Sequence, residues 1–330
     1  MINKFILLYI FMVPLLFADE FTVMTLNAQN LFDTKDDKFK DDKAYLPIEF
    51  KQSKKHINSC NNINVDVWRD ECLNLDWDNA TKNAKLHNLY KNIISFEDNG
   101  PDILALQEVE NINILRQLFK LLEPYGYIDL TLVEGKDYRG IDTAIISKFK
   151  IIDSRLHYIK FSGKYEDKDT RPILDATILV NKKKLKIYNV HFPSGFNDVS
   201  MRFDSLNLLE DLLKSHNFPV IALGDFNVNT REDNEFNIYK SQENLWHVAH
   251  LIGCSECKGT YYYNYGQTWE YLDTIFVSKN RKINFLDQSI NIHINAVNSY
   301  SDTGKPKRFN PKHKTGVSDH FAMVAGIKLN

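Results

Sequence analysis

Short apolar runs recur along the chain and predict β-strands. Residues 21–26 alternate apolar and β-branched side chains and lead straight into Asn27, which is the pattern of a strand with one face on a core. The other runs are almost continuously apolar, which is typical of strands buried on both faces. We expect these further strands at residues 102–107, 143–147, 173–179, 185–190, 220–223, 274–277 and 322–327.

Three longer segments between these runs carry apolar residues at helical spacing. Residues 84–96, 112–122 and 201–215 repeat apolar side chains at i, i+3 and i+4, which predicts amphipathic helices. Many strands with few helices between them favour an α/β or α+β sandwich, in which two sheets pack face to face with helices outside. Because no repeat, low-complexity tract or Pro/Gly-rich linker divides residues 19–330, we expect a single domain.

Residues 1–18 predict a secretory signal peptide. Lys4 precedes an apolar run over residues 5–17, and Ala18 stands before two acidic residues. This run is shorter than the roughly 20 residues that span a bilayer. We expect cleavage after Ala18, which places the mature protein in the periplasm or outside the cell with no membrane span. An uncleaved anchor and a buried strand are the alternatives.

Residues 33–78 are predicted to be an insertion into the domain. The segment is polar, with alternating charges as in Lys35-Asp36-Asp37-Lys38. Loops of this length in compact domains are usually functional or disordered. An ordered lid is favoured by the large apolar residues Trp68, Leu73, Leu75 and Trp77. A solvated decoration of the surface is the alternative.

The chain has four cysteines, Cys60, Cys72, Cys254 and Cys257. An even number in an exported chain favours disulfides, and four cysteines allow three pairings. We predict Cys60–Cys72, which would close a loop within the insertion, and Cys254–Cys257. A zinc site that includes His56 and a redox Cys-x-x-Cys motif are the alternatives, although the second pair lacks the βαβ context of a redox motif.

Acidic, amide and histidine residues stand where the apolar runs end. Strand ends at one rim of a sandwich converge in space although they are far apart in sequence. Oxygen ligands with histidines but without sulfur suit Mg²⁺, Mn²⁺ or Ca²⁺ and a phosphate oxygen, rather than structural zinc. The set comprises Asn27, Glu108, His191, Asp225, Asn227, Asp273, Asp319 and His320.

This ordered set resembles the endonuclease/exonuclease/phosphatase superfamily, and within it the deoxyribonuclease I-like branch. The matching motifs run from Thr-Leu-Asn27 to Ser-Asp319-His320, which is nearly the whole mature chain. Each motif alone is weak, but five or six in the right order are specific. The resemblance implies a four-layer α/β sandwich of two packed mixed sheets flanked by helices.

The resemblance also implies a metal site. Glu108 and Asn27, with Asp319 close by, would hold a divalent cation that polarises a phosphoryl oxygen. Mg²⁺ is expected, with Mn²⁺ and Ca²⁺ as alternatives. His191 would contact the phosphate and assist the leaving oxygen. A histidine at this position is typical of deoxyribonuclease-like and sphingomyelinase-like members, whereas abasic-site repair enzymes typically have tyrosine.

The remaining catalytic roles follow from the same resemblance. His320, oriented by Asp273, would be the general base for the attacking water or a charge partner of the phosphate. Asp225 is the competing candidate for the base. Asn227 would hydrogen-bond the scissile phosphate or position the nucleophile.

Three further residues resemble substrate-contacting positions of the family. Arg171 would contact the phosphate backbone. Arg139 and Asp142 stand where the family often has a further polar contact or a carboxylate partner for the histidine. Surface salt bridges are the alternative for all three.

The formal net charge of -2, from 41 Lys+Arg and 43 Asp+Glu, excludes a globally basic nucleic-acid coat. A polyanion must therefore be bound by a local patch. The segment 305–314, with Lys307 and Arg308, is basic and stands just before Asp319, so we expect a phosphate-binding loop over the rim. A solvated loop is the alternative.

Two other patterns flank the motifs. Residues 182–184 are three lysines between two predicted strands and indicate a tight hairpin. Residues 261–269 contain four tyrosines and a tryptophan, which either stack on bases or pack in the core.

Together these patterns predict an exported, divalent-metal-dependent nuclease that cleaves phosphodiester bonds of DNA, and of RNA as a second substrate, with little sequence preference. The chain is expected to act as a monomer. One alternative is a phosphodiesterase or phosphatase acting on lipid or inositol phosphates. The other is a non-catalytic binding protein on the same fold, which the complete set of catalytic positions disfavours.

Overall fold

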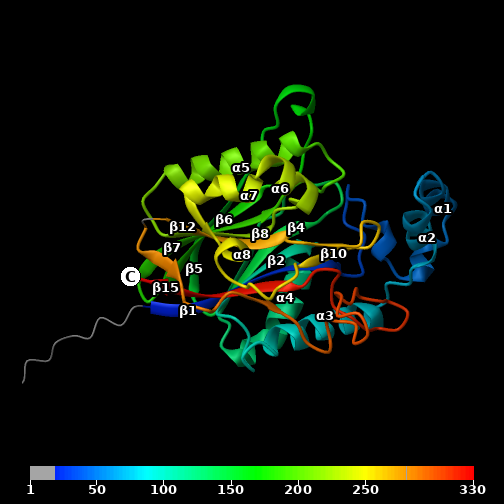
Figure 1. Ribbon diagram of the computed structural model, residues 1–330. Helices are drawn as coiled ribbons and strands as arrows, with labels where there is room; N and C mark the ends of the chain where they lie inside the picture. The colour runs from blue at the N-terminus through cyan, green and yellow to red at the C-terminus, as the bar shows by residue number, and fades with distance from the viewer. Residues whose placement is uncertain (1–18, 280) are drawn as a thin grey trace, which may run out of the picture.

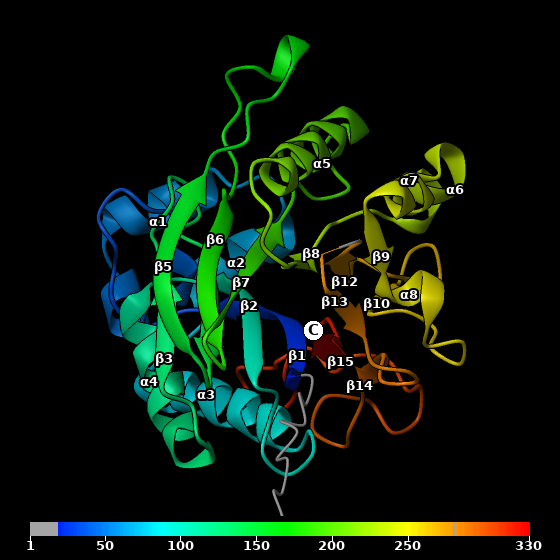
Figure 2. The ribbon, with the colours of Figure 1, turned by 90° about the vertical axis from the view of Figure 1, so that its left-hand side faces the viewer.

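The computed structural model describes residues 19–279 and 281–330, so the predicted signal peptide lies outside the described residues. Two β-sheets pack face to face, and helices cover the outer face of each sheet (Figures 1 and 2). This is the predicted four-layer α/β sandwich. Among the described helices, none is both long and apolar enough to cross a membrane.

The first sheet has seven strands. Its order is β13-β15-β1-β2-β4-β3, and β14 also pairs with β15. β1 and β2 are parallel and the other neighbours are antiparallel, so the sheet is mixed. The strands are β1 (Asp19–Leu31), β2 (Ile103–Val109), β3 (Asp129–Leu132), β4 (Asp142–Ser147), β13 (Ile283–Phe285), β14 (Asn291–His293) and β15 (Ala322–Leu329).

The second sheet has six strands in the order β5-β6-β7-β8-β12-β9. It too is mixed, because β7 and β8 are parallel. A separate two-stranded hairpin is formed by β10 (Tyr261–Tyr263) and β11 (Thr268–Glu270). The strands of the sheet are β5 (Lys150–His157), β6 (Ile173–Val180), β7 (Lys183–His191), β8 (Val220–Asp225), β9 (Trp246–Val248) and β12 (Asp273–Ser278).

Helices form the two outer layers. The first sheet is covered by α3 (Asn79–Ile94) and α4 (Ile112–Leu122). The second is covered by α5 (Val199–Lys214) and α7 (Ile238–Ser241), with α6 (Thr230–Phe236) beside them. The remaining elements are short: α1 (Lys54–Asn61), α2 (Asp66–Asn74), α8 (Ala249–Ile252), η1 (Lys43–Tyr45), η2 (Ile48–Lys51), η3 (Glu123–Tyr125), η4 (Gly163–Tyr165) and η5 (Gln242–Asn244).

The almost continuously apolar strands are explained by this layering. In β1, Val23 packs between the sheets and Met24 packs under α3 and α4. In β7, Ile187 faces the other sheet and Tyr188 faces α5. Successive side chains point to opposite faces, so a strand between two cores needs apolar residues at every position. Full burial of each large aliphatic side chain contributes about 1.5–3 kcal/mol.

The predicted elements are confirmed, and the structure adds others. All eight predicted strands and all three predicted helices are present. The lysine hairpin is also present, since β6 and β7 are joined through Asn181 and Lys182, both with positive φ. The elements that the pattern did not predict are short or lie at sheet edges, where a strand buries little surface: β3, β5, β9, β10, β11, β13, β14 and the helices other than α3, α4 and α5.

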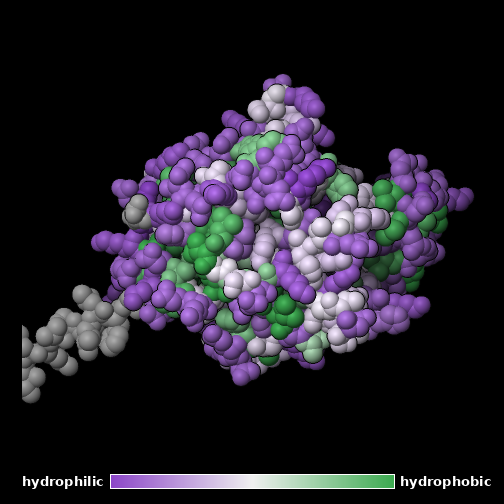
Figure 3. All heavy atoms as spheres, viewed as in Figure 1, coloured by the Kyte–Doolittle hydropathy of each residue, from purple (hydrophilic) through white to green (hydrophobic). Residues whose placement is uncertain are grey.

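The segment 33–78 is ordered and protrudes beside the sandwich as a small helical unit (Figure 1). Its base packs on the domain through a hydrophobic cluster of Phe32, Trp77, Ile141 and Phe309, and Tyr45 stacks on Phe32. The predicted alternative of a fully solvated decoration is therefore wrong for its base. Its outer part is more exposed: Trp68 is 58% exposed, and hydrophobic residues are visible on this unit in Figure 3.

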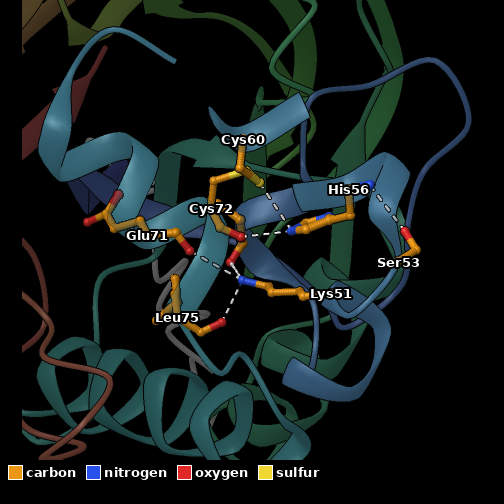
Figure 4. The surroundings of a disulfide bond; sticks show 8 residues. Lys51, Ser53, His56, Cys60, Glu71, Cys72 and Leu75 are labelled. Atoms are coloured by element: carbon orange, nitrogen blue, oxygen red, sulfur yellow. Dashed lines mark hydrogen bonds between the residues drawn. A yellow bond between two sulfur atoms is a disulfide. The ribbon is translucent and has the colours of Figure 1, made fainter. Parts of the chain in front are cut away.

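The predicted cysteine pairing is confirmed. Cys60–Cys72 joins α1 to α2 with a Cα–Cα distance of 5.6 Å, and Cys254–Cys257 has 5.2 Å. His56 Nε2 lies 3.2 Å from Cys60 Sγ, but the two sulfurs of this pair are bonded to each other, so the zinc alternative is not adopted (Figure 4). The Lys51 ammonium donates to the carbonyls of Glu71 and Leu75 and fixes the end of α2 beside the disulfide.

Candidate active site

The predicted site residues meet at one edge of the two sheets. Strand register places them side by side: His191 at the end of β7 is level with Asp225 at the end of β8, and Asp225 is level with Asp273 at the start of β12. Asn27 in β1 is level with Gln107 in β2. In Figure 1 this edge is where β1 ends, on the side of the insertion.

Asn27 links the two sheets. Its Nδ2 donates to Asp225 Oδ2 at 3.1 Å, and its Oδ1 accepts from the backbone N–H of Gln29 at 2.9 Å. The side chain is 2% exposed, so these bonds fix its orientation. One amide therefore joins the end of β1 to the end of β8.

Glu108 lies where the regular pairing of β2 breaks. Its φ is 60°, and the β2–β4 register shifts between Leu106 and Val109. Such irregularities turn a side chain away from its regular direction in the strand. Glu108 Oε2 accepts from the backbone N–H of Asn30 at 3.0 Å, which aims the partly exposed carboxylate toward the rim.

His191 is almost fully buried between two carboxylates. Its Nε2 lies 3.7 Å from Asp225 Oδ2 and 3.9 Å from Glu108 Oε1, and its Nδ1 has no hydrogen-bond partner in the described residues. Burial, together with the charges of Arg171 and Arg139, holds the pKa of His191 well below its usual value. At neutral pH this imidazole is uncharged.

His320 and Asp273 form the second buried pair. His320 Nδ1 and Asp273 Oδ2 are 2.7 Å apart, so Nε2 is the ring nitrogen left for a substrate. Burial lowers the pKa of His320, but the neighbouring charges of Asp273, Asp225 and Asp319 outweigh it and raise the pKa to about 10. His320 is therefore an imidazolium at neutral pH. Tyr261 packs on its ring with a centroid distance of 5.0 Å.

Asp225 and Asn227 follow each other in one turn. Asp225 Oδ1 accepts from the backbone N–H of Asn227 at 2.9 Å, and Asn227 Nδ2 donates to the carbonyl of Phe192 at 3.0 Å. Burial and the charge of Asp273 raise the pKa of Asp225 to about 7. Because the Asn227 amide nitrogen is engaged with the chain of β7, this side chain ties the two strand ends together.

The surroundings differ among the three residues that resemble substrate-contacting positions of the family. Arg171 is 11% exposed, donates to the carbonyl of Phe192 at 2.8 Å and lies 3.8 Å from Asp137. Arg139 is exposed and donates to Asn30 Oδ1 at 3.1 Å, beside Glu108. Asp142 is buried and accepts from the backbone N–H of Gly135, so in the described residues it is not the carboxylate partner of His191.

The basic loop lies against the rim, but its two predicted residues differ. Arg308 is 56% exposed, with Nη1 3.8 Å from Asp319 Oδ2. The Lys307 ammonium instead lies over the ring of Tyr300, 5.9 Å from its centroid. Arg308 is therefore the residue of this pair that lies next to the site.

Several residues that support the site carry no role in the sequence prediction. Ser318 Oγ donates to the carbonyl of Asn27 and accepts from the N–H of His320, so it joins both halves of the site. Behind it, Gln107 Nε2 donates to Asn189 Oδ1 at 2.7 Å and links the two sheets. The sequence does mark Gln107 and Asn189 as unusual, because they are amides within otherwise apolar strands. Gln107 precedes Glu108, and Asn189 is close to His191.

A family model described as the Endonuclease/Exonuclease/phosphatase family matches residues 62–320. The chain belongs to this family. The predicted resemblance is thus confirmed over most of the chain. Enzymes of the endonuclease/exonuclease/phosphatase family are phosphoesterases that generally depend on a divalent metal. No curated protein sequence gives a significant match.

Solved structures of the family share the fold at low identity. A family protein from Bacteroides thetaiotaomicron has a TM-score of 0.56 and 14% identity, covering 95% of this chain and 99% of its own. D. rerio TDP2 complexed with a single-strand DNA product has a TM-score of 0.54 and 14% identity. The match covers 93% of this chain and 98% of that chain. A mannosyl-6-phosphatase from Bacteroides thetaiotaomicron has a TM-score of 0.54 and 15% identity. The match covers 93% of this chain and 99% of that chain.

The rim fits the divalent metal that family enzymes generally need. Glu108 and Asp319 offer partly exposed carboxylates, and Asn27 offers an amide oxygen held in place by two hydrogen bonds. Two partly exposed carboxylates beside a buried amide oxygen suit Mg²⁺, which keeps several of its own waters. The four cysteine sulfurs are elsewhere and paired, so the donor set excludes a thiolate zinc site.

Proposed function

We propose that the protein is an exported nuclease that uses Mg²⁺ to hydrolyse phosphodiester bonds of DNA, with RNA as a second polynucleotide substrate and little sequence preference. The observation that carries this proposal is the arrangement of Asn27, Asp225 and His320 with Glu108 and His191 at one edge of both sheets. Two disulfides support export, because such bonds persist in oxidising compartments.

In this proposal, Glu108, Asn27 and Asp319 hold the metal. When bound, the ion supplies Lewis acidity toward a phosphoryl oxygen and offsets the charge of the transition state. Asn27 also donates to Asp225, so the same residue positions the carboxylate of the second sheet.

His320 then supplies positive charge to the phosphate, and Asp225 accepts a proton. The carboxylates of Asp225 and Asp273 each lie within 4.8 Å of a His320 ring nitrogen, which favours the imidazolium form. We assign His320 Nε2–H to the phosphate, and Asp225 to acceptance of the proton from the attacking water. Asp273 fixes the ring through Nδ1, as the third group of a hydrolase triad does.

His191 completes the contacts to the reacting group. Its neutral ring can donate from Nε2 to a phosphoryl oxygen near the leaving group. Asn227 holds the turn after β8, close to the place where the nucleophile would stand.

Residues outside this centre favour a polynucleotide over a small phosphate ester. Arg308 beside Asp319 and Arg139 beside Asn30 are both exposed at the rim. A phosphomonoester has one phosphate, whereas a DNA strand offers flanking phosphates to each arginine. Phosphate contacts of this kind carry no base specificity, in line with cleavage that has little sequence preference.

The test incubates the mature protein with supercoiled plasmid in Mg²⁺, in Mn²⁺ and in chelator. We expect nicking only with metal, and loss of nicking in His320→Ala. The matched control is His87→Ala, an exposed histidine on α3 away from the rim motifs. Nicking that persists in chelator or in His320→Ala would contradict the proposed chemistry.

The second arm separates diesters from monoesters. Bis(p-nitrophenyl) phosphate should be hydrolysed faster than p-nitrophenyl phosphate under the same conditions. If sugar, inositol or lipid phosphates release phosphate while plasmid stays intact, the protein is a phosphatase or lipid phosphodiesterase instead. If no phosphoester is cleaved, the alternative of a non-catalytic binding protein stands.

A further inference from the structure

A second cluster of carboxylates lies at the base of the insertion. Asp33 follows β1, Asp37 and Asp42 belong to the first turns of the insertion, and Glu110 follows β2. Asp37, Asp42 and Glu110 each offer a carboxylate oxygen within 4.8 Å of the others. Asp33 is joined to the group because its backbone N–H donates to Glu110 Oε2.

Three of these four carboxylates are buried, and Asp37 is partly exposed. Asp42 is 1% exposed, Glu110 3% and Asp33 6%. No lysine, arginine or histidine of the described residues forms a salt bridge with any of the four carboxylates. Lys40, one of the four lysines in residues 35–43, donates instead to the carbonyls of Gly135 and Asp137. Buried like charges without compensation are strongly unfavourable.

Hydrogen bonds orient the carboxylates but leave one oxygen unused. Asp42 Oδ2 accepts from the N–H of Asp37 at 2.6 Å, and Asn111 Nδ2 donates to Asp37 Oδ2 at 3.2 Å. Asp42 Oδ1 is fully buried and has no partner in the described residues. A cation would satisfy an acceptor oxygen that is buried in this way inside a group of carboxylates.

We propose that Asp33, Asp37, Asp42 and Glu110 bind one calcium ion that fastens the insertion to the ends of β1 and β2. Calcium takes six to eight oxygen ligands and tolerates several carboxylates, whereas Mg²⁺ is smaller and keeps its waters, which a buried cluster disfavours. This site is distinct from the rim, although Glu110 is two residues from Glu108. The ion would therefore set the position of the strand end that carries Glu108.

Calorimetric titration with Ca²⁺ tests the stoichiometry. Glu108→Gln removes a rim ligand and should still bind one calcium ion. Asp42→Asn should weaken that binding at least about tenfold. Asp41→Asn is the matched control, because it removes an exposed charge next in sequence and should bind as the unaltered chain does. Equal calcium binding by Asp42→Asn and Asp41→Asn, or no calcium binding by Glu108→Gln, would overturn the proposal.

Thermal unfolding gives a readout independent of activity. In the Glu108→Gln variant, which lacks a rim ligand, Ca²⁺ at about 100 times Kd should raise Tm by about 5 °C, and Mg²⁺ should not replace it. In chelator, Asp42→Asn should be more stable than the unaltered chain, because repulsion between the carboxylates is relieved. In Ca²⁺ it should be less stable than the unaltered chain. A Tm that does not respond to Ca²⁺ would refute the site.

Terbium luminescence covers the case in which Asp42→Asn does not fold. The Trp77 indole donates to the carbonyl of Phe32, the residue before Asp33, and so lies beside the cluster. Tb³⁺ excited through tryptophan should emit in Glu108→Gln, and the emission should fall in Glu108→Gln with Trp77→Phe. Emission that Ca²⁺ does not displace would contradict a calcium site.

Discussion

Asp273 has no exposed surface, and its Oδ2 is hydrogen-bonded to His320 Nδ1 while its Oδ1 has no partner in the described residues. A buried carboxylate with one partner is costly unless that partner is charged. Asp273 and His320 therefore depend on each other, and both depend on Asp225 nearby. At the residue scale, the site is a set of buried charges that are stable only as a group.

Asp273→Asn tests this dependence. The amide keeps the shape but removes the charge that holds the His320 imidazolium, so kcat/KM on bis(p-nitrophenyl) phosphate should fall by about 10²–10⁴-fold. The double variant with His320→Ala should lose little more than His320→Ala alone, because the two residues act as one unit. Fully multiplicative losses would show that Asp273 acts independently.

Asp175 in β6 provides a prediction away from the site. It is buried and is held by Lys186, Arg155 and His157. Burial raises the pKa of Asp175, but these hydrogen bonds and charges outweigh it and lower the pKa to about 2. The stabilisation is therefore complete above about pH 4, where the unfolded carboxyl is ionised, and is lost as the pH falls from about 4 to about 2.

Asp175→Asn should lower the free energy of unfolding at pH 7 by about 2 kcal/mol, and the difference should shrink below pH 4. Urea unfolding at a series of pH values measures it. Asp153→Asn, an exposed residue of β5, is the control and should change stability by less than about 0.5 kcal/mol. A destabilisation that is constant between pH 7 and pH 2 would exclude the ionic cause.

At the scale of elements, the strand ends position the side chains of the proposed site, and local backbone irregularities orient them. Gly224, just before Asp225, has φ 144°, and a Cβ there would lie 2.0 Å from the carbonyl oxygen of Val190. β7 and β8 can therefore bring His191 level with Asp225 only with glycine at this position. The Glu108 side chain is oriented in a different way, by the break in the pairing of β2.

The Cys60–Cys72 bond belongs to this scale, because it joins α1 to α2 over a short loop. Replacing both cysteines by alanine should destabilise the helical unit by about 2–3 kcal/mol through loop entropy. Hydrogen exchange should rise in residues 54–74 while β1, β2 and β8 keep their protection. Faster exchange in those core strands would mean that the insertion and the sandwich unfold together.

At the scale of the whole molecule, a formal charge of -2 hides an uneven distribution. Carboxylates gather at the rim and at the base of the insertion, and exposed arginines stand beside the rim. A polyanion that approaches such a surface meets local positive charge at the arginines, at the lysines of segment 305–314 and at bound cations. DNA binding should therefore depend on a few phosphate contacts, each of which contributes about 1 to the slope of log K against log salt.

Arg308→Ala should weaken DNA binding and reduce the slope of log K against log salt by about 1. Lys307→Ala should change the slope less, because its ammonium lies over Tyr300. Filter binding in Ca²⁺ from 50 to 200 mM salt, in a His320→Ala background, measures both without cleavage. Equal slopes for Arg308→Ala and the parent would show that this arginine does not contact phosphate.

The amino-acid sequence alone determined the layers and the rim. Strands buried on both faces need unbroken apolar runs. The polar side chains of the proposed site interrupt those runs at the strand ends, so Glu108, His191 and Asp225 can be recognised from the sequence. What only the tertiary structure decided depends on contacts between distant segments. The hydrogen bond of Asn27 to Asp225, the different surroundings of Arg308 and Lys307, and the meeting of Asp42 with Glu110 leave no periodic signal, because each arises where separate strand ends and loops pack together.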